Sequence, residues 1–476
     1  MSKQDSISKR FFRSALGVLL ARVLAFVAVF GFNAVLARAL SPTDFGLFLL
    51  MFSLIGLASL FGCAGMNRAL VKQIAQLGEN TAPLAIRRLI NIGLGTGTIG
   101  GALIGIAGGI ATYYLYPSSV ASSAAAPLRI GVLLAGIIWL RTIHLVMSET
   151  ARGFHEKTWS NLFGSPAGGP LPHLLFLIML LCTWQWFGLT TLTQTLTLYF
   201  ASFAITLPPL MVRVYSLRFQ GSQKQLSNSQ TELPLNGNNA TGSIMLLALP
   251  LMLTQTFGLT MSQADVWLAG ALAVPTSLAI YCAAQRMLAF LTIPLQIAGT
   301  GIVSFVPELV AKRQTKRLQE LVGLAATLAG IPGVLIGIGF LIFPVAVLSF
   351  AFGEYYAQGA DLLRILAIGQ IICILTGPCE IVLMMAGHQN KTLVVNSIAA
   401  IAIFTLGPLA IIYFSITGLA IALATITSCQ NLANWILAKR LLGIGTHVGA
   451  VDRQAIAQTI QKLQASFPTR SPISPQ

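Results

Sequence analysis

Charged residues are scarce in this sequence. Only 9% of its 476 residues are charged, and 13 are acidic, whereas a soluble globular chain carries about 25% charged residues. Hydrophobic residues make up 55%, and the mean hydropathy is +0.79. A soluble protein this apolar would expose large hydrophobic patches. The composition therefore excludes an ordinary soluble domain and predicts a membrane protein.

The sequence also lacks the motifs of catalysis and cofactor binding. Its five histidines show no metal-ligand spacing, and its six cysteines form no CxxC pair. There is no Walker A motif for nucleotide binding. The longest loop expected outside the cytoplasm, around residues 116–127, carries no charge, which argues against a membrane sugar polymerase or glycosyltransferase. We therefore expect a protein that is not an enzyme and that holds no metal or other cofactor.

Basic residues outnumber acidic residues by 29 to 13, which gives a net charge of +16. They stand in short clusters between apolar runs, and no motif for binding DNA or RNA accompanies them. Basic loops of this kind face the anionic lipids of the cytoplasmic leaflet. We therefore expect membrane lipid, and no nucleic acid, among the partners.

Apolar runs long enough to cross a bilayer recur along the whole chain. They predict an all-α integral membrane protein with about twelve transmembrane helices. The predicted spans are 12–40, 44–65, 89–115, 128–150, 170–187, 190–213, 242–270, 277–306, 321–350, 362–386, 392–413 and 416–438. With a cytoplasmic N-terminus, most basic residues fall in cytoplasmic segments, and the outward loops hold only Arg129 and Arg364. Both termini are therefore expected in the cytoplasm.

The two halves of the chain resemble each other. Leu36–Leu40 (LARAL) matches Leu268–Leu272 (LAGAL), and further matches recur at almost the same offset, close to half the chain length. Each half holds six spans, so the predicted repeat is parallel. The predicted domains are an N-terminal six-helix lobe (1–216), a polar cytoplasmic linker (217–241), a C-terminal six-helix lobe (242–440) and a cytoplasmic tail (441–476).

Polar and ionisable side chains inside the spans are the candidate functional residues, because a charge at the centre of a membrane helix costs about 2.5–3.5 kcal/mol. The candidates for a substrate cavity are Arg22, Asn33, Arg38, Arg141, His144, Gln255, Asp265 and Arg286. The candidates for ion coupling are Asp265 and Glu380. Arg22 is expected near mid-membrane on the first span, on the same helical face as Asn33.

Several of these candidates also have a structural interpretation. Asp265 and Arg286 belong to adjacent spans and can neutralise each other, and Arg38 can extend to the membrane interface. Glu380 suits either a proton site or a partner at a helix break. In the third span, glycine recurs at every fourth residue from Gly93 to Gly109, which predicts close packing against another helix.

Two stretches of the sequence carry the motifs of a known family. Residues 33–75 contain Asn33, Leu36-Ala37-Arg38, Gly46-Leu47-Phe48 and Gly65-Met66-Asn67-Arg68-Ala69-Leu70 in this order. This stretch resembles the opening of the polysaccharide flippases, the Wzx-type exporters of O-antigen and related lipid-linked sugars. Residues 263–287 resemble the seventh and eighth helices of that family, with Asp265 and Arg286 at matching positions and Ala279 where the family often has glycine.

The resemblance implies a MATE-like fold of the multidrug/oligosaccharidyl-lipid/polysaccharide exporter superfamily, with two lobes around a central cavity and an alternating-access cycle. It also implies a lipid-linked oligosaccharide substrate on undecaprenyl diphosphate. The expected site is the bacterial inner membrane, in cell-surface polysaccharide biosynthesis (lipopolysaccharide, O-antigen or exopolysaccharide) alongside polysaccharide-assembly proteins. Arginine side chains suit such a substrate, because their forked donors match phosphate oxygens. The alternatives are a MATE-like drug or cation exporter, a peptidoglycan-precursor flippase and a membrane sugar polymerase.

Overall fold

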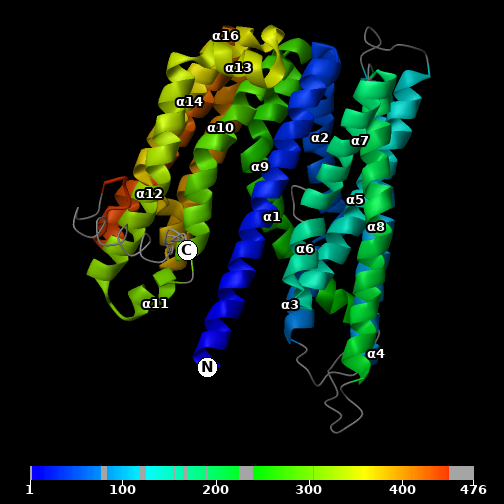
Figure 1. The fold of residues 1–476 in the computed structure, drawn as a ribbon, viewed down its shortest axis with the longest axis horizontal. Coiled ribbons are helices and arrows are strands. Elements are labelled where there is room, and N and C mark those ends of the chain that lie inside the picture. Colours follow the sequence, from blue (N-terminus) through cyan, green and yellow to red (C-terminus); the bar gives the residue numbers. More distant parts are fainter. Residues whose placement is uncertain are drawn as a thin grey trace, which may run out of the picture. The chain divides into compact units, whose positions relative to one another are not determined.

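The computed structural model describes residues 3–76, 83–116, 125–154, 156–164, 169–188, 191–223, 240–303 and 305–449. Every regular element in these ranges is a helix, which confirms the predicted all-α fold (Figure 1). The predicted linker lies mostly outside the described residues, as does the predicted tail beyond residue 449.

The chain forms two compact units, residues 1–270 and 271–476. The first unit contains α1 (Lys3–Ala39), α2 (Pro42–Cys63), α3 (Met66–Gln76), α4 (Pro83–Leu115), α5 (Ala126–Gly153), α6 (Lys157–Phe163), α7 (Pro170–Phe187), α8 (Leu192–Gln223) and nearly all of α9 (Ala240–Leu272). The second unit contains α10 (Pro275–Ile302), α11 (Phe305–Ala311), α12 (Thr315–Ile342), α13 (Pro344–Phe352), the 3-10 helix η1 (Glu354–Gly359), α14 (Ala360–Thr376), α15 (Cys379–Met385) and α16 (Gln389–Leu442). The boundary between the units falls in the last turn of α9, whereas the predicted linker precedes α9. The predicted domains therefore stay a prediction.

Ten of the described helices are long and apolar enough to cross a membrane. This count is two lower than the predicted twelve, and the difference arises at α9 and at α16. Helix α9, which matches the predicted span 242–270, is not among the ten. Helix α16 counts once, although its 54 residues would extend about 80 Å, far more than the roughly 30 Å of hydrocarbon in a bilayer.

A sharp break divides α16 into two helices. Phe414 and Ser415 have non-helical backbone angles, and Ser415 has a positive φ of 55°. After the break the chain folds back, since a Cβ built on Gly418 would lie only 2.2 Å from the Ala410 carbonyl oxygen. The two parts of α16 therefore correspond to the predicted spans 392–413 and 416–438.

Local sequence explains how α2 begins and ends. The Ser41 hydroxyl accepts a hydrogen bond of 3.1 Å from the Asp44 amide, and Pro42 occupies the first helical position. Both features favour a helix start. The left-handed conformations of Ala64 (φ 47°) and Gly65 (φ 76°) end the helix and turn the chain into α3.

The glycine row of α4 packs closely against neighbouring helices, as predicted. A Cβ on Gly105 would lie 2.6 Å from the Ala135 carbonyl oxygen in α5, and a Cβ on Gly109 would lie 2.6 Å from the Gly131 carbonyl oxygen. The backbones of α4 and α5 can touch there only because these residues have no side chains.

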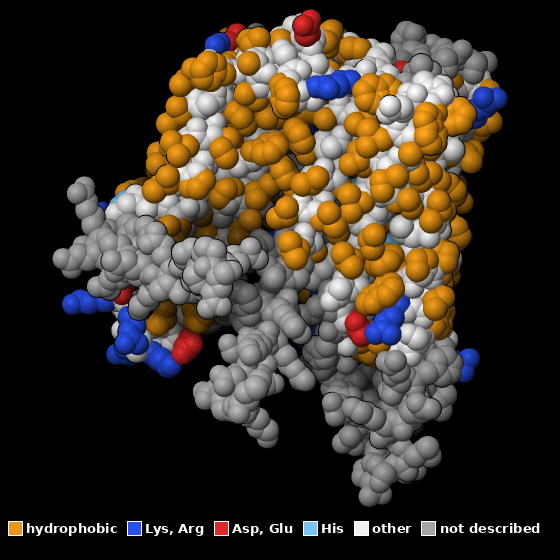
Figure 2. All heavy atoms as spheres, in the orientation of Figure 1, with side chains coloured by type: hydrophobic (Ala, Val, Ile, Leu, Met, Phe, Trp, Pro, Cys, Tyr) orange, Lys and Arg blue, Asp and Glu red, His pale blue; other side chains and the backbone are white. Residues whose placement is uncertain are grey.

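Hydrophobic side chains cover the visible lengths of the helices, and Lys, Arg, Asp and Glu side chains lie near the helix ends (Figure 2). This distribution suits helices surrounded by lipid, whose charged ends reach water.

Candidate functional site

Arg141 and His144 lie one turn apart on α5 and are buried inside the first unit. Arg141 is 5% exposed, and its guanidinium carbon lies 5.8 Å from the centre of the Phe52 ring. His144 Nε2 lies 3.1 Å from the Thr206 hydroxyl of α8. The same hydroxyl lies 2.8 Å from the Ser202 carbonyl oxygen. Both candidates are thus enclosed by α2, α5 and α8.

His173 belongs to the same buried region and was missed by the sequence analysis. It is fully buried in α7, and its Nδ1 lies 2.8 Å from the Gly169 carbonyl oxygen, which makes Nδ1 the protonated nitrogen. Its ring stacks on Phe32 with centroids 5.7 Å apart and meets Phe52 and Tyr199 at 6.0 and 6.1 Å. The sequence feature that could have identified it is the presence of a histidine inside the predicted span 170–187.

Arg22 and Asn33 share a face of α1 but differ in burial. The Arg22 side chain is exposed among apolar neighbours, including Val23 at 42% and Leu24 at 37% exposure. Asn33 is fully buried, and its amide donates to the Val29 carbonyl oxygen at 2.7 Å. Arg38 is exposed in the last turn of α1, where a cation complements the helix dipole.

Gln255 connects α9 to α3. The Asn67 amide donates to Gln255 Oε1 at 2.9 Å, and Arg68 Nε donates to the same oxygen at 3.4 Å. A second link joins Trp267 Nε1 to the Ser53 hydroxyl at 3.1 Å. These two links hold α9 antiparallel to α2. The sequence analysis did not select Asn67, although it lies within the Gly65–Leu70 motif.

Asp265 and Arg286 lie in different units. Asp265 is 3% exposed in α9, and Arg286 is half-buried in α10. Their ion pair therefore stays a prediction.

Glu380 receives a chain of amide hydrogen bonds within the second unit. Asn396 Nδ2 donates to Glu380 Oε1 at 2.8 Å, and Gln430 Nε2 donates to Asn396 Oδ1 at 2.9 Å. The chain joins α15 to both parts of α16.

Two ion pairs lie near the end of α5 and the start of α6. Arg152 of α5 lies 2.9 Å from the buried Glu149, and Arg213 of α8 lies 2.6 Å from Glu156. Within the described residues no group of three His, Cys, Asp or Glu side chains could hold a metal ion.

Two protein-family models match separate parts of the chain. The model described as polysaccharide biosynthesis protein matches residues 9–114, and the MatE model matches residues 250–409. No curated protein matches the sequence. With its apolar helices, the chain is a multi-pass membrane protein.

Solved structures of transporters and flippases share the fold. An inward-facing multidrug resistance MATE family transporter of the MOP superfamily is 13% identical with a TM-score of 0.63, covering 90% of this chain and 94% of that one. The lipid II flippase MurJ, in an inward closed conformation, is 11% identical with a TM-score of 0.60, covering 96% and 94%. A Vibrio cholerae MATE transporter, VcmN, is 16% identical with a TM-score of 0.57, covering 92% and 98%.

The chain therefore has the transporter and flippase fold of the MOP superfamily, the multidrug/oligosaccharidyl-lipid/polysaccharide exporters. The resemblance inferred from its sequence is confirmed by both family models and by the fold. The matched proteins are transporters and flippases rather than enzymes.

Proposed function

We propose that the protein is a flippase that moves an oligosaccharide linked to undecaprenyl diphosphate across the bacterial inner membrane by alternating access. Its product would serve cell-surface polysaccharide biosynthesis, and polysaccharide-assembly proteins would be its partners. The observation that carries this proposal is the match of residues 9–114 to the polysaccharide biosynthesis family, together with the exposed Arg22 inside that segment.

The chemistry of Arg22 supports an anionic substrate. A cation on a spanning helix costs about 2.5–3.5 kcal/mol when it faces lipid near mid-membrane. That cost is avoided where the side chain meets water or an anion. A diphosphate offers oxygens that an arginine fork can bind with two parallel hydrogen bonds.

The proposal is tested by substituting Arg22 and measuring surface polysaccharide in a strain that depends on this protein. Arg22→Ala should lower export about tenfold or more, because a hydrogen bond to a charged group contributes about 1.5–3 kcal/mol. Arg22→Lys should retain part of the activity, since it keeps the charge but loses the fork. Arg22→Glu should be inactive.

The control is Leu24→Ala, which shortens an exposed neighbour on the same helix and should leave export unchanged. Protein in isolated membranes is quantified for every variant. Normal export by a well-expressed Arg22→Ala variant would eliminate Arg22 as a substrate ligand.

A MATE-like drug or cation exporter is the second candidate, because residues 250–409 match the MatE family. The exposed cation of Arg22 disfavours a cationic substrate. Resistance of the same strain to organic cations separates the two functions. Loss of that resistance without loss of polysaccharide would favour the exporter.

A further inference from the structure

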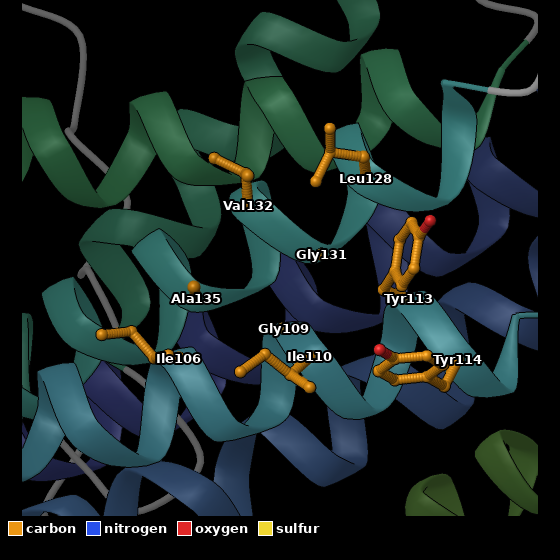
Figure 3. A pocket seen from close by; sticks show the side chains of 9 residues that line it. All are labelled: Ile106, Gly109, Ile110, Tyr113, Tyr114, Leu128, Gly131, Val132 and Ala135. Carbon is orange, nitrogen blue, oxygen red and sulfur yellow. The ribbon is translucent and has the colours of Figure 1, made fainter.

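An apolar groove runs along the first unit between the end of α4 and the start of α5 (Figure 3). Its volume is about 400 Å³, within the roughly 300–1,000 Å³ typical of ligand pockets. Ile106 and Ile110 form one wall, and Leu128 and Val132 form the other. We call this feature the α4–α5 groove.

The groove exists because Gly109 and Gly131 at its floor have no side chains, and Ala135 beside them has only a methyl group. Gly109 of α4 and Gly131 of α5 approach so closely that a Cβ on either would lie 2.6 Å from the carbonyl oxygen of the other. Small-residue faces often pair membrane helices between chains. Here that face is already occupied within the chain, which disfavours a second copy as the occupant.

The walls point to a hydrocarbon chain as the occupant. Their side chains are 54% to 64% exposed, and all lie within the spans Arg87–Leu115 and Ala126–Gly153. At this depth the surrounding solvent is lipid. An apolar groove between these walls suits one acyl chain.

Polar groups lie at the outer end of the groove. Tyr113 and Tyr114 line it there and are 48% and 78% exposed. Arg129 follows the wall residue Leu128 in the first turn of α5 and is exposed. Tyrosine is favoured where hydrocarbon meets water, and arginine binds phosphate oxygens as a fork. The charge at this end is therefore complementary to an anionic phosphate headgroup.

We propose that the α4–α5 groove is a binding site for one anionic phospholipid, with an acyl chain between the two walls and its phosphate at Arg129. By the predicted topology this lipid belongs to the outer leaflet. The proposal does not depend on the transported substrate.

The test is native mass spectrometry of the full chain, purified in mild detergent and titrated with phosphatidylglycerol or with phosphatidylcholine of the same acyl chains. The wild-type protein should retain one phosphatidylglycerol in preference to phosphatidylcholine. Arg129→Gln should bind phosphatidylglycerol about tenfold more weakly, the loss expected for a charge-assisted hydrogen bond. It should bind phosphatidylcholine as before.

Val132→Phe should lower retention of both lipids, because the larger ring fills the groove. Its matched control is Val212→Phe on α8, which alters a side chain of similar exposure (69%) outside the groove and should bind as the wild type does. Elution of each variant as a single symmetric peak shows that it is folded.

Three results would overturn the proposal. The first is unchanged preference for phosphatidylglycerol in Arg129→Gln, and the second is unchanged retention in a folded Val132→Phe. The third is a lipid-free dimer that Val132→Phe abolishes, which would make the groove an interface between two copies.

Discussion

Two alanine substitutions on α4 should have different effects on stability. Gly105 meets the Ala135 carbonyl oxygen of α5, and a Cβ there would lie 2.6 Å away. Gly95, ten residues earlier on the same helix, has nothing within 4 Å of a built Cβ. Gly105→Ala and Gly95→Ala therefore add the same methyl group to the same helix in opposite surroundings.

The sizes of the two effects follow from this geometry. The atom opposing the new methyl group in Gly105→Ala is backbone, so relief requires α4 and α5 to separate by several tenths of an ångström. Overpacking of this kind costs about 1–3 kcal/mol, and a gap of about 0.5–1 Å already removes a quarter to a half of each dispersion contact across the interface. Gly95→Ala meets no such contact and should stabilise the helix by up to about 1 kcal/mol.

Unfolding of the purified variants in mixed micelles, at increasing denaturing detergent, measures both effects. Gly105→Ala should unfold at a lower detergent fraction than the wild-type protein, and Gly95→Ala at an equal or higher one. Equal midpoints for the two variants would show that the backbones of α4 and α5 do not touch at Gly105. The account of the glycine row would then be wrong.

Three further predictions concern the amide link, an exposed ion pair and the topology. Gln255→Leu should cost about 1–3 kcal/mol of unfolding free energy, because it leaves the buried Asn67 amide without its partner; the double variant with Asn67→Leu should be more stable than Gln255→Leu alone. The Lys312 ammonium, hydrogen-bonded to Glu308 at 2.5 Å, lowers the pKa of Glu308 below its ordinary 4.5. The pair therefore stabilises the folded protein above about pH 4.5 and loses this effect as the pH falls. In the Glu308→Gln variant, the unfolding midpoint should depend less on pH in this range. A reporter enzyme active only outside the cytoplasm should be silent when it is fused at Asn236, and activity there would refute the predicted topology.

The fold could largely be predicted because the length and hydropathy of an apolar run identify a membrane helix. The predicted span 170–187 coincides with α7 (Pro170–Phe187), although two prolines made its start ambiguous. Both prolines lie in the first turn, where a helix tolerates them. The break at Ser415 was also anticipated, by a change of span between residues 413 and 416.

The short helices could not be predicted in the same way. Helices α3, α6 and α11 are 11, 7 and 7 residues long, far below the length of a span. Hydropathy carries no signal for them, because they do not cross the hydrocarbon. Their positions matter nevertheless, since α3 supplies the Asn67 and Arg68 side chains that hold Gln255.

The candidate site shows most clearly what a single sequence leaves open. Arg22 and Arg141 look alike in the sequence, because each is an arginine among apolar residues in a spanning helix and each incurs the same insertion cost. The structure separates them: Arg22 is exposed, whereas Arg141 is buried against Phe52, which lies on α2 and is distant in the sequence. The spacing of residues along α5 cannot predict such a contact, because it indicates only which residues share a face of that helix. The two arginines therefore differ in what they can do in this conformation. Arg22 is accessible from outside the protein, whereas Arg141 is enclosed by α2, α5 and α8.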